Sequence, residues 1–283
     1  MVQPNMGKML TMKPRSWYRL PDVFDKDLRL LLYSMSLRRI SMGFLGVVRA
    51  IYFALLGLSP VEIGILLSLA TFVSAVHHIT FGMLSDRLGR KPFLIIGGIF
   101  ATLRMVIFAV SSDFWMLALA QGVGAMGEGA GAGQPVVSGY IADKTNVENR
   151  SSLFSTLAVS NGLAATIGAL LAGLPASFQS ALALDVITAH SLLFWIGAAG
   201  GVASILLIIP LQDVKSTRTD EEETRTTLKA HSWGVIARFS LVRSTSGVGW
   251  SFIKSLMSLY FYLQFSLGSE VLGPIYAVAR LLS

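Results

Sequence analysis

The chain has 283 residues, of which 53% are hydrophobic and 14% are charged, with a mean hydropathy of +0.63 and a formal net charge of +7. A soluble domain carries roughly 25% charged residues, so a soluble fold of this size could not cover its apolar surface. The absence of cysteine excludes disulfides, thiolate metal sites and a cysteine nucleophile. The net charge alone is compatible with nucleic-acid binding, so the positions of the basic residues decide that question.

Seven stretches are apolar enough to cross a bilayer, which requires about 20 residues of helix. In chain order they are Ile40–Leu58, Val61–Leu84, Phe93–Val110, Phe114–Ile141, Ser152–Leu174, Ile187–Leu211 and Val248–Leu267. An eighth apolar run begins near Leu272 and reaches Ser283, which is too short to span. The sequence therefore predicts an all-α, polytopic membrane helix bundle.

The basic residues alternate between the two sides of this bundle. Nineteen of the 23 Lys and Arg residues fall in the N-terminal tail or in the loops after the second, fourth and sixth segments, and the other loops have none. Because cytoplasmic loops are enriched in Lys and Arg, the pattern predicts a cytoplasmic N-terminus in the cell membrane and explains the positive charge without nucleic acid. No small-residue cleavage pattern precedes the first segment, so no cleavable signal peptide is expected. The tail before Ile40 is interpreted as a surface amphipathic helix or as a solvated leader.

The loop between the second and third segments reads "FGMLSDRLGRKPF" and places an acid beside three bases. Topology explains the bases and turn geometry explains the glycine, but neither explains the acid. The stretch resembles the signature loop of the major facilitator superfamily, G-x-L-x-D-R-x-G-R-K/R. The matching residues are Gly82, Leu84, Asp86, Arg87, Gly89, Arg90 and Lys91.

The resemblance continues after the fourth segment, where "IADKTNVENR" has Asp143 and Arg150 at positions where the family carries an acid and an arginine. It implies a fold of two six-helix halves. It also implies a cytoplasmic charge cluster of Asp86, Arg90 and Asp143 that latches the inner side closed while the outside is open. The predicted cytoplasmic gate therefore comprises Gly82, Asp86, Arg87, Gly89, Arg90, Lys91, Asp143 and Arg150.

Three departures from the family are visible. Ala118 stands where many proton-coupled members have an arginine, and Gly168 is followed by Ala169 where antiporters have Gly-Pro. The chain reaches only the eighth of twelve expected spans, which predicts a truncated second half. The predicted division is a cytoplasmic tail at 1–39, a six-helix half at 40–211, a cytoplasmic linker at 212–245 and the start of the second half at 246–283.

Charged residues within the spans mark a candidate substrate site, because each costs roughly 2.5–3.5 kcal/mol at a helix centre. Arg49 and Glu128 are expected at similar depth, and the resemblance places Lys254 on the same cavity. Gln134 precedes Pro135 and is expected at a helix break that exposes carbonyl groups. Glu128 is a candidate proton carrier. A purely structural Arg49–Glu128 pair is the alternative.

Other polar residues within the spans have structural explanations. Arg104 is expected to have a structural partner or to extend toward the outer surface, and His77 and His78 are expected to be packed and hydrogen-bonded. The "GVGAMG" stretch matches a dinucleotide-binding pattern, but no strand precedes it. Its glycines are therefore interpreted as helix-packing positions.

The resemblance implies a secondary transporter that moves a small solute by alternating access, with a proton as the candidate coupling ion. Two bases against one acid in the site favour an anionic or zwitterionic solute. The alternatives are a non-transporting receptor or scaffold, an inactive fragment, or an intramembrane serine protease using Ser138 and His190, which are expected at opposite ends of the bundle. The expected partners are the solute and the lipid bilayer, and no cofactor or metal is expected.

Overall fold

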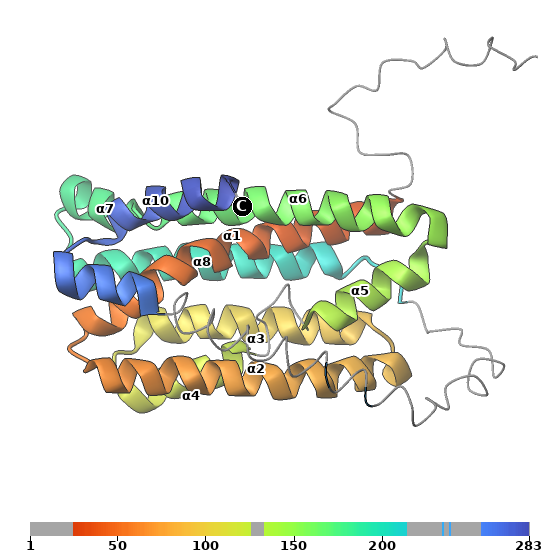
Figure 1. The fold of residues 1–283 in the computed structure, drawn as a ribbon, viewed down its shortest axis with the longest axis horizontal. Coiled ribbons are helices and arrows are strands. Elements are labelled where there is room, and N and C mark those ends of the chain that lie inside the picture. The colour runs from red at the N-terminus through yellow and green to blue at the C-terminus, as the bar shows by residue number, and fades with distance from the viewer. Residues whose placement is uncertain (1–24, 126–132, 214–233, 235–237, 239–255, 283) are drawn as a thin grey trace, which may run out of the picture.

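The computed structural model describes residues 25–125, 133–213, 234, 238 and 256–282. These residues form a bundle of helices without strands (Figure 1). The helices are α1 (Lys26–Leu55), α2 (Pro60–Leu88), α3 (Lys91–Val110), α4 (Phe114–Ala125), α5 (Gly133–Lys144), α6 (Val147–Leu171), α7 (Leu174–Leu182), α8 (Val186–Ile208) and α10 (Ser269–Leu281), and residues 256–265 are also helical.

Several helices begin at polar residues that bind their first backbone N–H groups. The Asp25 carboxylate accepts a hydrogen bond from the N–H of Leu28 (2.8 Å) at the start of α1. Ser59 and Glu62 form a capping box at α2, and Asp185 accepts from Ile187 and Thr188 at α8. These side chains satisfy N–H groups that have no partner within the helix. The short polar loops therefore define where each helix begins.

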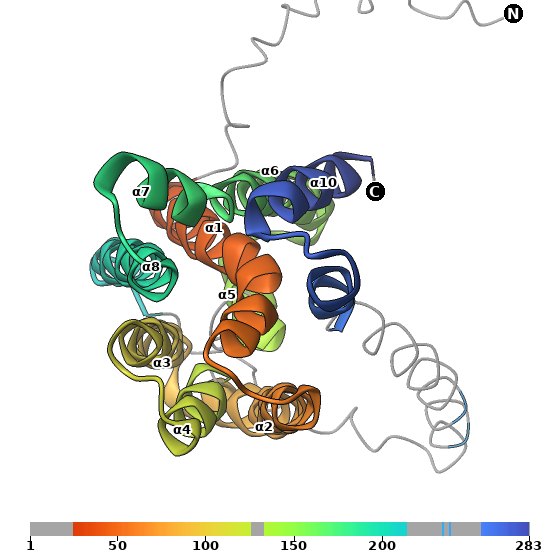
Figure 2. The same cartoon turned by 90° about the vertical axis from the view of Figure 1, so that its left-hand side faces the viewer.

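Helix α1 is the centre of the packing, with α6 and α10 on one side and α3 and α8 on the other (Figure 2). Gly43 on α1 and Gly168 on α6 form the closest crossing. A Cβ atom added to Gly43 would lie 2.5 Å from the carbonyl oxygen of Ala165 and 2.8 Å from the Cα of Gly168. Such close backbone contact requires glycine, and it is typical of helix packing in membranes.

The outer surface of the bundle is apolar. Val61, Phe72 and Trp115 are 72%, 68% and 76% exposed. Among the described residues, four helical stretches are long and apolar enough to cross a membrane: Pro60–Leu88, Lys91–Val110, Val147–Leu182 and Val186–Ile208. Helix α1 is 30 residues long but carries four arginines. The predicted all-α membrane bundle is confirmed.

Several predicted boundaries need correction. Helix α1 begins at Lys26 rather than near Ile40, and Leu28, Leu31 and Leu32 are buried in the bundle. Residues 26–39 are therefore part of the first long helix, and form neither a separate surface helix nor a solvated leader. The predicted fifth segment ends earlier, in α6, and is followed by the separate helix α7.

Other predicted boundaries fall partly outside the described residues. The predicted fourth segment is covered by α4 and α5, and residues 126–132 between them are not described. The seventh segment is described from residue 256 onward, and most of the predicted linker is outside the description. The division into tail, two halves and linker stays a prediction.

Candidate functional site

The signature loop forms a tight corner between α2 and α3. Gly89 ends α2 with a φ of 94°, a conformation that favours glycine. A Cβ atom at this position would also lie 2.5 Å from the carboxylate of Asp213. Asp213 accepts a hydrogen bond from the backbone N–H of Lys91 (3.3 Å), so the chain that follows α8 is attached to the same corner. Gly89 is required both by the turn and by this contact.

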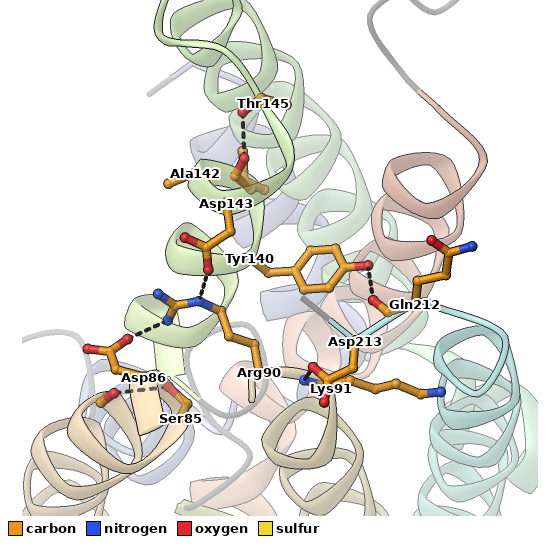
Figure 3. Close-up of polar contacts among 12 residues, drawn as sticks. Ser85, Asp86, Arg90, Lys91, Tyr140, Ala142, Asp143, Thr145, Gln212 and Asp213 are labelled. Carbon is orange, nitrogen blue, oxygen red and sulfur yellow. Dashed lines mark hydrogen bonds and ion pairs between the residues drawn. The ribbon is translucent and has the colours of Figure 1, made fainter. Parts of the chain in front are cut away.

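Arg90 joins two carboxylates from different helices (Figure 3). Its Nη1 lies 2.8 Å from Asp86 on α2, and its Nε lies 2.5 Å from Asp143 on α5. The guanidinium lies against α5 at Gly139, where a Cβ atom would collide with it. Arg90 is 8% exposed, whereas Arg87 faces outward. The structure thus brings together Asp86, Arg90 and Asp143, which we call the motif cluster, and we call this end of the bundle the motif end.

Other residues of the predicted gate support this arrangement from nearby. Arg150 donates to the carbonyl oxygens of Ala142 (2.7 Å) and Thr145 (3.3 Å), so it holds the end of α5 rather than a carboxylate. Gly82 faces Pro135 of α5 at an ordinary van der Waals distance, since a Cβ atom there would lie 3.5 Å from Pro135 Cβ, so this contact does not itself require glycine. All described contacts of the motif cluster lie among three helices. Its described contacts therefore fix α2, α3 and α5 to one another.

A second polar cluster at the motif end was not predicted from the sequence. The Asp27 carboxylate on α1 accepts from Lys144 Nζ (2.7 Å) and from the backbone N–H of Gln212 (3.2 Å). The Tyr140 hydroxyl lies 3.5 Å from the same carboxylate and donates to the carbonyl oxygen of Gln212 (3.0 Å). We call these four residues the Asp27 cluster. It joins the start of α1, the end of α5 and the chain after α8.

The electrostatics of Asp27 follow from these contacts. Burial raises the pKa of this carboxyl group, but the hydrogen bond and charge of Lys144 and the N–H of Gln212 outweigh it. The net effect is a pKa below the ordinary value of 3.8, so Asp27 is ionised at neutral pH. Lys144 directly follows Asp143 of the motif cluster, so the last turn of α5 takes part in both clusters.

A polar contact also occurs between the apolar helices, far from the motif end. Arg49 on α1 donates to the side-chain oxygen of Gln121 on α4 (3.3 Å). Gln121 is fully buried and donates to the carbonyl oxygen of Leu66 on α2 (3.4 Å). Sequence analysis did not select Gln121 as a site residue, although its position beside Gly122 in the glycine-rich stretch marked the fourth segment. Gln121 thus links Arg49 on α1 to the backbone of α2.

The remaining members of the predicted substrate site are not tested by this geometry. Glu128 and Lys254 lie outside the described residues, and Gln134 lies in the first turn of α5. Pro135 also lies in the described part of α5, and residues 126–132 directly before this helix are outside the description. The predicted break at 134–135 therefore stays a prediction. The Arg49–Glu128 pair stays a prediction.

Arg104 and the histidines have mainly packing roles in the structure. Arg104 is fully buried against Gly124 of α4 and donates to the sulfur of Met42, so it does not extend to the outer surface. His77 donates from Nδ1 to the carbonyl oxygen of Val73 and packs on Phe81. His190 donates to the carbonyl oxygen of Val186 and stacks on Tyr52, at the end of α8 away from the motif end. Nothing in this arrangement supports a Ser138–His190 pair.

Comparisons with known proteins agree with this geometry. The model of the Major Facilitator Superfamily matches residues 31–283. The inner membrane transport protein YajR of Escherichia coli is 34% identical over 185 residues, which cover 62% of this chain and 37% of YajR. The class B tetracycline resistance protein of Escherichia coli is 31% identical over 47% of this chain and 34% of its own length. The quinolone resistance protein NorA of Staphylococcus aureus is 25% identical over 83% of this chain and 58% of its own length.

A crystal structure of a bacterial homologue of the human lysosomal transporter Spinster, inward-facing and unoccupied, has the same fold. Its TM-score is 0.71 at 18% identity, over 93% of this chain and 61% of that one. The chain belongs to the Major Facilitator Superfamily. It spans between about one third and three fifths of the length of these relatives. Membership of this family implies a membrane environment.

Proposed function

We propose that the chain acts in secondary transport of a small organic solute by alternating access. The observation that carries this proposal is the motif cluster, in which one buried arginine binds carboxylates on two helices next to a tight corner. Such a cluster has two discrete arrangements, paired and broken, as a rocking transporter requires. The relatives named for tetracycline and quinolone resistance make these two compound classes the first candidates for the solute.

The motif cluster acts in this proposal as a switch at the cytoplasmic side. When Arg90 binds both Asp86 and Asp143, the α2–α3 corner is rigidly attached to α5, and this attachment favours one arrangement of the two halves. Asp86 has a 45% exposed side chain, so its pairing contributes little to folding stability. A change at Asp86 can therefore alter the switch without unfolding the helix bundle.

The substrate site in this proposal lies near Arg49, whose guanidinium is positioned by Gln121. Glu128, Lys254 and Gln134 complete the site, with Glu128 as the proton carrier. The contact between Arg49 and Gln121 supports this location, because a charged group between membrane helices needs a fixed polar partner. A positively charged site favours an anionic or zwitterionic solute.

The experiment compares Asp86→Asn with Arg87→Gln in proteoliposomes that contain the purified chain. Uptake of a fluorescent quinolone and of a tetracycline is measured under an imposed proton gradient. We expect Asp86→Asn to lower transport about tenfold, which corresponds to a change of ~1.4 kcal/mol between the two arrangements. Arg87→Gln removes a charge that faces outward from the same loop and should leave transport nearly unchanged. Equal transport by wild type and Asp86→Asn would contradict the proposed switch and would show that the loop serves only to orient the helices in the membrane.

A further inference from the structure

Two buried arginines line one cavity on the side of α1 that faces α3 and α8. Arg38 is 5% exposed and Arg104 is fully buried. The cavity holds about 10 Å³ and is also lined by Ser41, Met42, Gly98, Ala101, Thr102, Met105, Gly197 and Gly201. Figure 2 shows that α6 and α10 lie on the opposite side of α1. This cavity is therefore separate from the motif cluster and from the face of α1 that meets the second half.

The surrounding helices are built to leave space for the Arg38 guanidinium. A Cβ atom on Gly98 would lie 2.8 Å from Arg38 Nη2 and 2.8 Å from Ile205 Cγ1, and one on Gly201 would collide with Thr102. Each glycine thus removes a side chain where α3 and α8 approach the cavity. Met42 and Met105 in its wall are flexible thioethers that can adapt to an occupant.

In the part of the chain that the structure describes, few protein groups form hydrogen bonds that offset the cost of burying the Arg38 charge. Its one hydrogen bond there runs from Nη2 to Ser204 Oγ, at 3.4 Å. The Ser204 hydroxyl is already engaged with Ser34, at 2.8 Å from its Oγ and 3.1 Å from its carbonyl oxygen. A guanidinium has five N–H donors, and a buried charge without a partner costs several kcal/mol. The Arg38 environment therefore favours a negatively charged occupant.

The size and lining of the cavity define the class of this occupant. A volume of about 10 Å³ corresponds to one water-sized particle, which is too small for a carboxylate or a phosphate group. The Ser41 hydroxyl lies in the wall, and its bond to the carbonyl oxygen of Gly197 is long (3.5 Å), so it can turn toward an anion, whereas the Thr102 hydroxyl donates to the carbonyl oxygen of Gly98 (2.9 Å). We propose that α1, α3 and α8 enclose a binding site for a single halide ion, chloride in the cell, held by Arg38.

The test measures the melting temperature of the purified chain in detergent while sodium gluconate is replaced by sodium chloride at constant ionic strength. Gluconate is too large for the cavity. Binding to the folded state stabilises it, so we expect a saturable rise of about 3 °C when chloride reaches ten times its dissociation constant. Bromide should produce the same rise. A cavity that holds water instead would give equal melting temperatures in both salts, and this result would overturn the proposal.

Substitutions locate the effect. Arg38→Gln should abolish the chloride dependence, whereas Arg39→Gln changes the neighbouring arginine, which does not line the cavity, and should retain it. If Arg38→Gln fails to fold, Ser41→Ala keeps the charge and removes the hydroxyl that can turn toward the ion, and it should shift the chloride dependence to higher concentration. Crystals grown in bromide should show an anomalous peak beside Arg38. Equal chloride dependence in wild type and Arg38→Gln, or bromide peaks at other positions alone, would contradict the proposed site.

Discussion

Asp27 shows how much of the motif end depends on one carboxylate. It sits in the first turn of α1, and it accepts hydrogen bonds from a lysine on α5 and from the backbone after α8. A negative charge near a helix N-terminus is also favourable for the helix dipole. Three segments that are distant in sequence are therefore fixed by a single side chain.

Removal of this charge should destabilise the folded state in a pH-dependent way. Asp27→Asn leaves Lys144 without its counter-charge in a largely buried position, so we expect a loss of about 3 kcal/mol at neutral pH. Because the pKa of Asp27 is lowered in the folded state, its contribution is fully present above 3.8 and is lost as the pH falls below that value. The melting temperatures of wild type and Asp27→Asn should therefore differ at neutral pH and converge in acid.

Asp25→Asn is the matched control, because asparagine caps a helix as well as aspartate does. It should change the melting temperature little at any pH. The double change Asp27→Asn with Lys144→Gln should recover part of the lost stability, since it removes both charges. Additive losses in the double variant would show that the two side chains do not interact.

Glu128 allows the proton-carrier role to be separated from a structural one. A carboxyl group within the membrane is predicted to be ionised beside Arg49 and to take up a proton when the two separate. Glu128→Gln should then leave solute exchange across proteoliposomes nearly intact, because exchange requires no net proton movement, and it should abolish accumulation driven by a proton gradient. A stable Glu128→Gln protein that still accumulates solute would exclude the role. If the pair is structural, protein yield should fall instead, and adding Arg49→Gln should restore it.

At the residue scale, the sequence indicated charge clusters better than it indicated buried polar partners. Asp86, Arg90 and Asp143 could be grouped because they resemble a known pattern. Asp27, Tyr140 and Gln121 could not, because each has an ordinary local sequence and gains its role from a helix that is distant in the chain. Only the tertiary fold brings Gln121 to Arg49, and Lys144 to Asp27, within hydrogen-bonding distance.

At the scale of helices, the crossing of α1 and α6 depends on two glycines without side chains between them. A Cβ atom on Gly168 would collide with the carbonyl oxygen of Ile40 and lie 2.8 Å from the Cα of Gly43. These are backbone atoms, so neither helix can yield by a side-chain rotation. Gly168→Ala should therefore lower stability by about 2 kcal/mol, as overpacking typically does.

Gly162 on the same helix provides the comparison for this prediction. No atom lies within 4 Å of a Cβ atom added there, so Gly162→Ala should be neutral or slightly stabilising, because alanine favours helix. Thermal unfolding of both variants in detergent checks the difference. A melting temperature for Gly168→Ala equal to that of Gly162→Ala would show that the two helices separate more easily than the crossing suggests.

Helix existence was predictable from apolar length, but helix boundaries were not. Lys26 to Arg39 read as a tail because the segment is basic, although its leucines are buried at the motif end. Arg38 in this part of α1 is buried against protein rather than lipid, so the cost of a charge in a membrane did not exclude it. Pro135 suggested a break in the fourth segment, and that break stays a prediction because residues 126–132 before α5 are outside the described residues.

At the scale of the whole molecule, the first half meets helix α10 through both packing and polar contacts. Gly273 on α10 approaches α6 so closely that a Cβ atom would lie 2.6 Å from the carbonyl oxygen of Ala169. Arg280 donates to the carbonyl oxygen of Ala165 on α6 (2.6 Å) and lies 3.5 Å from that of Gly43 on α1. The side of α6 that faces the second half is thus recognised partly through its backbone.

The alternation of basic loops predicts the orientation of the whole bundle. Single cysteines introduced at Lys91 and at Arg225 should react with a membrane-impermeant maleimide only after the cells are opened. A cysteine at Asp113, which caps α4 at the opposite end, should react in intact cells. Because the chain has no cysteine of its own, the background is low. Reaction of the cysteine at Lys91 in intact cells would overturn the predicted orientation.

The corner at Gly89 makes this position unusually intolerant of substitution. A residue with a side chain at this position would need a backbone with positive φ, and its Cβ atom would displace the Asp213 carboxylate. Both effects destabilise the folded state. The neighbouring Leu88 is 60% exposed and has no comparable constraint. Consider a library that contains every substitution at both positions and is sorted for folded protein. The folded variants should retain glycine at position 89 almost exclusively, whereas position 88 should accept most residues. The corner thus limits which descendants of this sequence can still fold.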